Sequence, residues 1–184
     1  VTVHDRTVVA TYAAEPVRVE VRLEADESPE LRMSLAATNT GAKVVELPLR
    51  FPDLGSITLG SAADTHYLFP RAAAVFGGEE ATLEEDYSSV FPMQFMDLYN
   101  PRTGAGLSLM VKDLDLTPKR FRLAKTAAGA SMSVSYSHRV RGSQEPQHVR
   151  IEPGATFRTA STVLGFHQGD WRVAFNAYRD WVRT

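Results

Sequence analysis

The sequence of 184 residues predicts an all-β protein, a large antiparallel two-sheet β-sandwich (a supersandwich) with one C-terminal amphipathic helix. Three observations carry this prediction. Apolar and polar residues alternate with a period of two over most of the first half, which is typical of half-buried strands. Turn signals separate about ten to twelve strand-like segments, more than an immunoglobulin-sized sandwich contains. No helical periodicity precedes residue 169. We therefore expect a sandwich domain at 1–168 and a junction helix at 169–184.

The first half shows the alternation most clearly. VRVEVRLE at 17–24 places four aliphatic side chains on one face of a strand and charged side chains on the other. ELRMSLAATN at 30–39 repeats this pattern, and KVVELPLRFP at 43–52 follows with Pro48, which predicts an edge position or a bulge. Short strands are also expected in SITLG at 56–60 and THYLFP at 65–70. Such strands have one face on a core and one in water.

The segment from Arg71 to Val90 breaks this rhythm, because Gly77 and Gly78 are followed by a run of acidic residues. We expect a long loop here, of the kind that is often functional or mobile. The alternative is a solvated excursion that includes a short helix.

The second half predicts a buried hairpin. MQFMDLY at 93–99 is apolar on both faces, so this strand is expected to be covered from two sides, and a buried Asp97 requires a partner. NPRTGAG is a turn, and LSLMVK at 107–112 returns as the paired strand. Further strands are predicted in RFRLAK at 120–125, SMSVSYSHRV at 131–140 and FRTASTVLGF at 157–166.

The last residues predict the helix, with Asp170 or Gly169 as the N-cap. Its apolar stripe consists of Trp171, Ala174, Phe175, Tyr178, Trp181 and Val182. The helix either packs on its own sandwich or forms the contact surface for a following domain, and these two roles are compatible. Because the sequence begins in a strand-like pattern without Met, we expect a piece of a longer protein, in which Trp181 is less exposed than here.

Composition excludes several function classes. The 20 basic and 22 acidic residues leave a net charge of −2, which gives no electrostatic reason to bind nucleic acid or an anionic membrane. The absence of cysteine excludes disulfides and thiolate chemistry. No apolar run is long enough to span a membrane, and neither metal-ligand spacing nor a phosphate loop or nucleophile elbow is present. We expect no cofactor and no metal. The composition leaves the cellular compartment open, and a secreted or periplasmic bacterial parent is compatible with it.

Candidate binding residues lie around the acidic segment. Exposed aromatic rings that stack on a pyranose are the usual sugar-binding platforms, but both tryptophans belong to the helix stripe. Asp113 and Asp115 at a strand end could serve acid–base chemistry or bind Ca²⁺, although such a pair is more often a solvated strand end. The candidate substrate-binding residues are Tyr67, Phe76, Glu79, Glu80, Tyr87 and Asp113.

Two blocks of the sequence resemble a known family. The tail is similar to the signature G-x-W-x-x-A-x-x-Y-R-x-W that ends the N-terminal β-supersandwich domain of certain bacterial glycoside hydrolases, at Gly169, Trp171, Ala174, Tyr178, Arg179 and Trp181. The predicted hairpin is similar to that family's P-x-x-M-Q-(F/W)-M-x-L-Y and G-G-L-Y-L-x-x-x-D, at Pro92, Met93, Gln94, Phe95, Met96, Leu98, Tyr99, Gly106, Leu107, Leu109 and Asp113. Ser108 departs from the pattern, where the family often has an aromatic residue.

This resemblance implies a galactose-mutarotase-like sandwich that precedes a (β/α)8 catalytic barrel. The family's catalytic carboxylates lie on the barrel, so no catalytic residue is carried over to this chain. The implied function is that of a non-catalytic accessory domain that supports the barrel and brings the segment from Gly77 to Tyr87 to the substrate cleft. Its partners would be carbohydrate, through the parent enzyme, and the catalytic domain of the same chain. The alternatives are an autonomous carbohydrate-binding module and a sandwich-fold sugar epimerase or lyase.

Overall fold

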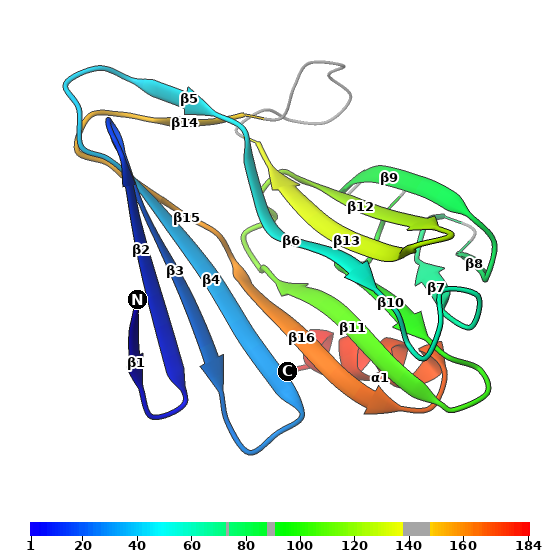
Figure 1. The fold of residues 1–184 in the computed structure, drawn as a ribbon. Helices are drawn as coiled ribbons and strands as arrows, with labels where there is room; N and C mark the ends of the chain where they lie inside the picture. Colours follow the sequence, from blue (N-terminus) through cyan, green and yellow to red (C-terminus); the bar gives the residue numbers. More distant parts are fainter. Residues whose placement is uncertain (73, 88–90, 138–147) are drawn as a thin grey trace.

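The protein is a β-sandwich with one terminal helix, described here from a computed structural model for all residues except 73, 88–90 and 138–147 (Figure 1). The larger sheet has ten strands in the order β1-β2-β3-β4-β16-β11-β10-β7-β8, with β15 paired to β4. Its strands are β1 (Thr2–His4), β2 (Thr7–Ala14), β3 (Val17–Ala25), β4 (Glu30–Asn39), β7 (His66–Phe69), β8 (Val75–Gly77), β10 (Phe95–Tyr99), β11 (Ala105–Lys112), β15 (Thr156–Arg158) and β16 (Ser161–Gln168).

Two smaller sheets complete the fold. The four-stranded sheet has the order β6-β13-β12-β9, and the two-stranded sheet pairs β14 with β5. Their strands are β5 (Val45–Leu47), β6 (Leu49–Ile57), β9 (Ala81–Tyr87), β12 (Lys119–Thr126), β13 (Gly129–Tyr136) and β14 (Val149–Ile151). Every pair of named strands is antiparallel within the described residues, as the sequence predicts. The described residues contain 16 strands rather than ten to twelve, because several strands have only three residues.

The main core lies between the four-stranded sheet and one half of the ten-stranded sheet (Figure 1). Alternating residues of β10, β11 and β12 fill it, and large fully buried members are Phe69, Phe91, Met96, Leu98, Leu109, Phe121, Leu123 and Met132. We call the face of the ten-stranded sheet that looks at this core its inner face. All five residues of β10 are buried, which confirms that this strand is covered from both sides.

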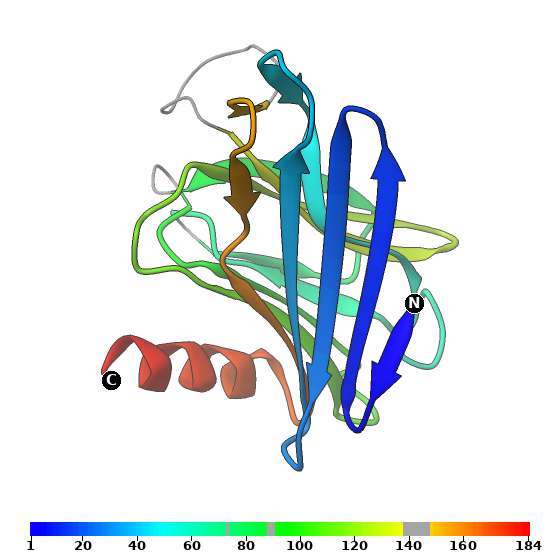
Figure 2. The same cartoon turned by 90° about the vertical axis from the view of Figure 1, so that its left-hand side faces the viewer.

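The helix α1 (Trp171–Val182) lies on the opposite, outer face of the same strands (Figure 2). Its stripe packs on Leu68, Phe95 and Met110, and the ring of Tyr178 stacks on that of Phe95 with centroids 5.1 Å apart. The Asp170 side chain accepts a hydrogen bond from the Arg172 backbone N–H, which confirms Asp170 as the N-cap. The prediction that the helix lies on its own sandwich is confirmed. No described helix is long and apolar enough to cross a membrane.

The acidic segment corrects the sequence prediction, since Gly77–Tyr87 is not a loop. It contains the end of β8 and the whole of β9, an edge strand of the four-stranded sheet. Leu83 packs against the core, while Glu84 and Asp86 on the opposite face form ion pairs with Arg120 of the neighbouring β12. Two of the carboxylates that suggested a solvated loop, those of Glu84 and Asp86, are therefore paired across the sheet. Residues 73 and 88–90 of the predicted loop lie outside the described part.

Other predicted strands are found close to their expected places. β3 and β4 form over 17–25 and 30–39, and the hairpin of β10 and β11 pairs Phe95 with Met110. Pro48 separates β5 from β6, and β6 is an edge strand of its sheet. The strand predicted at 131–140 ends at Tyr136, and residues 138–140 are not described. The segment 157–166 is divided between β15 and β16.

Candidate functional site

The outer face of the ten-stranded sheet carries a row of polar residues beside the start of α1. Strand pairing aligns His66 of β7 with Tyr99 of β10, Tyr99 with Gly106 of β11, and Gly106 with His167 of β16. Residues paired directly across antiparallel strands share one face of the sheet. This row therefore lies on the same face as α1, and the rings of His66 and Tyr99 are 5.7 Å apart between centroids.

Asp97 and His167 form a buried pair within this region. The Nε2 atom of His167 lies 2.9 Å from Oδ1 of Asp97, so the partner that the sequence requires for Asp97 is found. The imidazole ring lies directly over Gly106, because a Cβ atom at this position would overlap the ring. The Asp97 side chain is inaccessible to solvent, and its burial raises the pKa of the carboxyl to about 6.

This pair retains unused hydrogen-bonding capacity. Neither Oδ2 of Asp97 nor Nδ1 of His167 has a hydrogen-bond partner among the described residues. The side chain of His167 is only 8% exposed. The pair can therefore hold a proton close to the sheet, but it does not project into solvent.

A cavity of about 450 Å³ lies next to the first turn of α1. It is lined by Leu68, Pro70, Ala74, Met93, Trp171, Arg172, Phe175 and Asn176. Apolar side chains form most of its wall, and Arg172 and Asn176 supply hydrogen-bond donors. Its size and composition are those of small-molecule sites, which are typically about 300 to 1,000 Å³ in volume.

Phe76 and Trp171 form an aromatic surface at this cavity. Their rings are nearly parallel, with an angle of 16° and a centroid separation of 6.2 Å. Phe76 is 59% exposed, and the guanidinium of Arg172 lies 4.7 Å from the centre of the Trp171 ring. Both tryptophans pack in the helix stripe, as the sequence predicts, and Trp171 is only half-buried there.

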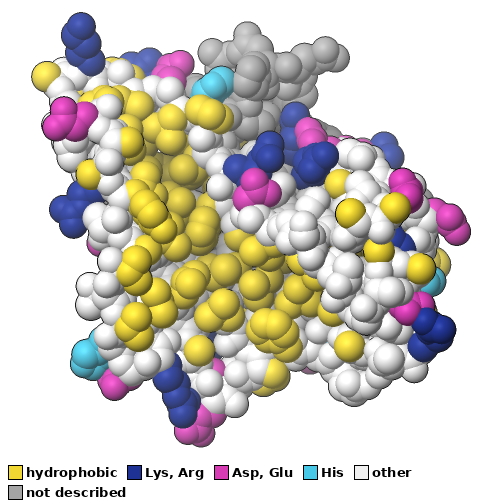
Figure 3. All heavy atoms as spheres, viewed as in Figure 1, with side chains coloured by type: hydrophobic (Ala, Val, Ile, Leu, Met, Phe, Trp, Pro, Cys, Tyr) yellow, Lys and Arg dark blue, Asp and Glu magenta, His cyan; other side chains and the backbone are white. Residues whose placement is uncertain are grey.

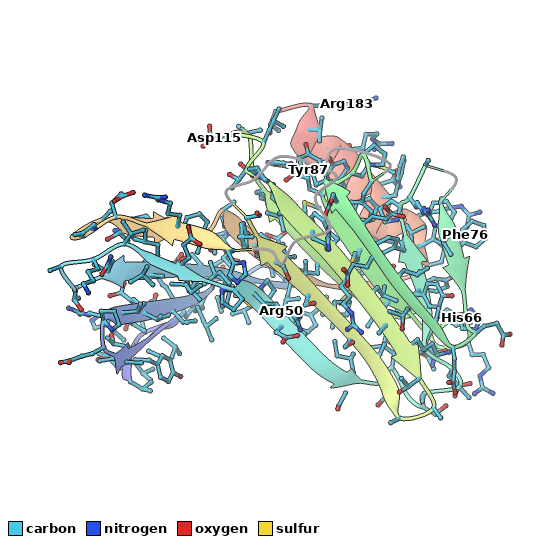
Figure 4. The ribbon with its side chains drawn as sticks, turned by 90° about the horizontal axis from the view of Figure 1, so that it is seen from above. Arg50, His66, Phe76, Tyr87, Asp115 and Arg183 are labelled. Atoms are coloured by element: carbon cyan, nitrogen blue, oxygen red, sulfur yellow. The ribbon has the colours of Figure 1, made fainter. Side chains whose placement is uncertain are left out.

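The predicted binding residues are distributed over four places. Phe76 belongs to the aromatic surface at α1, whereas Tyr67, on the alternate face of the sheet, is buried in the main core. Glu79 and Glu80 line a separate cavity of about 300 Å³ together with Lys125. Figure 4 shows Phe76 and His66 towards one end of the molecule and Tyr87 and Asp115 well away from them.

Tyr87 and Asp113 both contact Lys119, which forms a buried ion pair with Asp113. Oδ2 of Asp113 accepts hydrogen bonds from Nζ of Lys119 and from the Thr117 backbone N–H, and Oδ1 accepts one from the Asp115 backbone N–H. Nζ of Lys119 also lies 4.5 Å from the centre of the Tyr87 ring. Burial opposes the charge on Asp113, but the hydrogen bond and the charge of Lys119 outweigh it, so the pKa of Asp113 is lowered.

This geometry separates the two carboxylates of the predicted Asp113–Asp115 pair. Asp113 is 4% exposed, whereas Asp115 is on the surface. The pair does not present two carboxylates to one ligand, which corrects that expectation. No group of three or more acidic or histidine side chains suited to a metal ion occurs within the described ranges.

Sequence reasoning missed two features that the fold brings together. The identity of the Asp97 partner depends on the pairing of β10, β11 and β16, and the two residues are 70 positions apart. The contact between Phe76 and Trp171 joins β8 to α1. The only sequence signals were an acidic residue in an apolar strand and two aromatic residues at the edges of predicted elements.

No protein-family model matches the sequence, and no curated protein matches it. Several solved structures share the fold at low identity. The α-galactosidase from Lactobacillus brevis is 14% identical over 89% of this chain and 23% of that protein, with a TM-score of 0.62. The α-galactosidase AgaA of family GH36 from Geobacillus stearothermophilus is 13% identical over 83% of this chain and 22% of that one, with a TM-score of 0.57.

A candidate aldose 1-epimerase from Klebsiella pneumoniae is 10% identical over 96% of this chain and 53% of its own, with a TM-score of 0.60. This chain thus spans about a quarter of the α-galactosidases and about half of the candidate epimerase. At sequence identities this low, the similarity establishes the fold and nothing further. The chain has the galactose-mutarotase-like β-sandwich fold that these carbohydrate-active proteins contain.

Proposed function

We propose that this chain is a non-catalytic accessory domain of a glycoside hydrolase that acts on carbohydrate. The observation that supports this proposal most directly is the size of the match, because the sandwich corresponds to only 22–24% of several α-galactosidase chains. In such an arrangement the chemistry belongs to another part of the enzyme. Fold similarity alone is weak support for an activity, so an accessory domain should also present a surface that another domain could use.

Helix α1 offers such a surface. One side of the helix packs on the sheet through Ala174 and its aromatic neighbours. Val182, a member of the predicted stripe, remains 59% exposed. The exposed Phe76 and the adjacent cavity extend this apolar surface along the start of the helix. A catalytic domain seated here would bury Val182 and fix the direction in which the chain leaves the sandwich.

The test compares chain 1–184 with the longer protein encoded by the same gene. We expect the downstream reading frame to encode repeated βα units, and the longer protein to hydrolyse an aryl glycoside in a panel that includes an α-galactoside. Chain 1–184 alone should be inactive on the whole panel. Hydrolysis by chain 1–184, or a reading frame without a second domain, would contradict the proposal.

A mutation tests the role of the helix in the longer enzyme. Val182→Asp should lower the activity or the temperature of inactivation, because it places a charge in the domain junction. Arg183→Ala is the matched control at the next position. Equal behaviour of the two variants would remove the support that α1 gives to this proposal.

The aromatic surface favours a second candidate function, sugar binding by the domain itself. Phe76 and Trp171 stack with nearly parallel rings, and Arg172 and Asn176 can donate hydrogen bonds beside them. Titration of chain 1–184 with neutral mono- and oligosaccharides, followed by NMR, measures this directly. Phe76→Ala should abolish any binding, whereas Leu114→Ala, which truncates a residue that is 83% exposed elsewhere, should preserve it. A flat response for the wild-type chain would rule out this candidate.

The third candidate, a sugar epimerase or lyase, has less support. Such an enzyme needs an acid and a base that converge in an open cleft. The Asp97–His167 pair combines a carboxyl and an imidazole, but the Asp97 side chain is inaccessible and His167 is 8% exposed.

A further inference from the structure

The four-stranded sheet carries two arginines on either side of a serine, on the face that points away from the main core. Strand pairing aligns Arg120 of β12 with Ser135 of β13, and Ser135 with Arg50 of β6. Residues paired directly across antiparallel strands share one face of a sheet. The next residues along β12 and β13, Phe121 and Val134, belong to the main core. Because successive side chains alternate between faces, the arginines and the serine lie on the opposite, solvent side.

A cavity of about 260 Å³ lies over this row. Its walls include Arg50, Arg120, Arg122, Glu84 and Ser135. Arg122 follows Arg120 by two positions on β12, so both side chains point to the same face. The short serine leaves the space, and the long arginines on the strands to either side enclose it. Figure 3 shows basic side chains gathered with acidic ones over this part of the four-stranded sheet.

The carboxylates of β9 beside the cavity are occupied by the arginines of β12. The two oxygens of Asp86 accept hydrogen bonds from Nε and Nη2 of Arg120, and Oε1 of Glu84 accepts one from Nη1. Oε2 of Glu84 lies 3.5 Å from Nε of Arg122. Every nitrogen of the Arg120 guanidinium therefore has a partner, and both oxygens of Glu84 face an arginine.

Arg50 and Arg122 retain donors that these carboxylates do not use. Within the described ranges neither guanidinium forms a side-chain hydrogen bond, because Arg50 approaches Asp53 only to 3.6 Å and Arg122 approaches Glu84 only to 3.5 Å. Their side chains are 50% and 36% exposed, so a ligand can reach them. A guanidinium has five N–H donors and no acceptor. The cavity therefore has donors in excess, and a ligand that fits it must supply acceptors.

We propose that this cavity binds the carboxylate of an acidic sugar, such as a uronic acid. The inference rests on the proposed function, which supplies carbohydrate as the class of ligand. A planar carboxylate matches the fork of guanidinium N–H groups, and hydrogen bonds between ionised partners are stronger than those between neutral ones. Arg50 and Arg122 hold the carboxylate, the hydroxyl of Ser135 bonds a ring hydroxyl, and Pro48 in the cavity wall contacts the ring.

The charges around the cavity limit the strength of this binding. On the described part of this face three arginines and three carboxylates balance one another, namely Arg50, Arg120, Arg122, Asp53, Glu84 and Asp86. The face therefore has no net charge that would attract every anion, and directed hydrogen bonds select the ligand. For a single sugar unit we expect a dissociation constant of roughly 1–10 mM.

The first test follows the amide NMR spectrum of chain 1–184 during separate titrations with galacturonate, galactose, acetate and sulfate at neutral pH and low ionic strength. Galacturonate should shift the signals of β6, β12 and β13, and the other three compounds should bind about tenfold more weakly. Added salt should weaken the galacturonate response, because the guanidinium groups are partly exposed.

Each contrary outcome of these titrations overturns the proposal. Acetate or sulfate that binds as tightly as galacturonate would show a site for free anions. Galactose that binds as tightly at the same signals would show that the carboxylate is not recognised. A spectrum that galacturonate leaves unchanged would show that the cavity binds no acidic sugar.

Substitutions locate the binding within the cavity. Arg122→Gln should raise the dissociation constant about tenfold, because it removes charge-assisted hydrogen bonds. Arg50→Lys should have a similar effect, since lysine keeps the charge but lacks the planar fork. Ser135→Leu should abolish binding by filling the floor while all three arginines remain. Ser131→Leu is the matched control, because Ser131 lies on the same face of β13 but does not line the cavity. Circular dichroism checks that each variant folds.

These measurements separate the cavity from the other proposals. Figure 4 shows Arg50 well away from Phe76, so Phe76→Ala should leave galacturonate binding unchanged. Unchanged affinity in both Arg122→Gln and Ser135→Leu would overturn the assignment of this cavity. The accessory role is tested by the activity of the longer protein, so a negative result with galacturonate would leave that role unaffected.

Discussion

The two halves of the ten-stranded sheet differ in how many of their faces are covered. β10, β11 and β16 lie between the four-stranded sheet and α1, and all five residues of β10 are buried. β2 and β3 have one face in solvent and the other only partly covered, so no residue of β3 is fully buried. The apolar pattern of a strand therefore shows which of its faces favours burial. Whether that face is buried depends on the neighbouring sheet or helix that covers it.

The largest expected effect concerns the ion pair in the covered region. The side chain of Lys119 is 0% exposed and pairs with Asp113. Lys119→Met leaves the Asp113 carboxylate buried without its cation, which should lower the free energy of unfolding by about 3–5 kcal/mol. Chemical denaturation measures this loss.

Arg18→Met, on the exposed outer face of β3, is the control for removing a cation and should change stability by less than about 0.5 kcal/mol. A similar effect at both sites would show that the covered region does not depend on this pair.

The second prediction compares two leucines of the same sheet. Leu109 is fully buried in β11, whereas Leu23 is half-buried on the inner face of β3. Leu109→Ala should cost about 3–4 kcal/mol, because it removes packing and leaves a cavity. Leu23→Ala should cost less than half as much, because the side chain is only half-buried. Equal losses in urea unfolding would mean that the two halves are equally well packed.

The third prediction concerns the pH dependence of the outer face of the covered half. Burial raises the pKa of Asp97 from an ordinary value of 3.8 to about 6, so the folded state retains a proton that the unfolded chain releases. The contribution of this group to stability is therefore present below pH 4 and is lost as the pH rises through about 6. A shift of about two units corresponds to about 3 kcal/mol.

Asp97→Asn removes this titration and isolates the effect from those of other carboxyl groups. The unfolding free energy of the wild type minus that of the variant should fall by up to about 3 kcal/mol between pH 4 and pH 7. A difference that stays constant with pH would show that Asp97 does not titrate with a raised pKa.

The smallest expected effect concerns the helix that covers the outer face. Asp170→Ala removes the N-cap hydrogen bond to the Arg172 N–H, which is 2.9 Å long, and should cost about 1 kcal/mol. Tryptophan fluorescence reports this region selectively, because both tryptophans of the chain lie in α1. Asp180→Ala is the control near the other end of the helix. A larger loss for Asp180→Ala would contradict the assigned cap.

The sequence predicts a strand or helix accurately where a single local signal, such as apolar periodicity or a capping residue, dominates. The alternation in VRVEVRLE predicts β3, the two-sided apolar run predicts the buried β10, and Asp170 followed by a 3.6-residue stripe predicts α1. The acidic run at 79–86 misleads the prediction because charge alone favours solvent. Arg120 lies on a strand that pairs with β9, so Glu84 and Asp86 are paired across the sheet.

The candidate site was less predictable than the fold. The sequence indicates that a buried Asp97 needs a partner, but any of five histidines or 20 basic residues could have supplied it. Only the register of β10, β11 and β16 selects His167. The meeting of Phe76 with Trp171 likewise depends on how α1 crosses the sheet.

The sequence by itself determined the all-β class, most strands, the capped terminal helix and the apolar character of each sheet face, because these depend on the period of nearby residues. The tertiary structure alone decided the partner of Asp97, the burial of Asp113 and the strand conformation of the acidic segment. It also decided that the inner faces of β1, β2 and β3 are only partly covered. These features depend on contacts between residues far apart in the chain, and local periodicity contains no information about which distant surfaces meet.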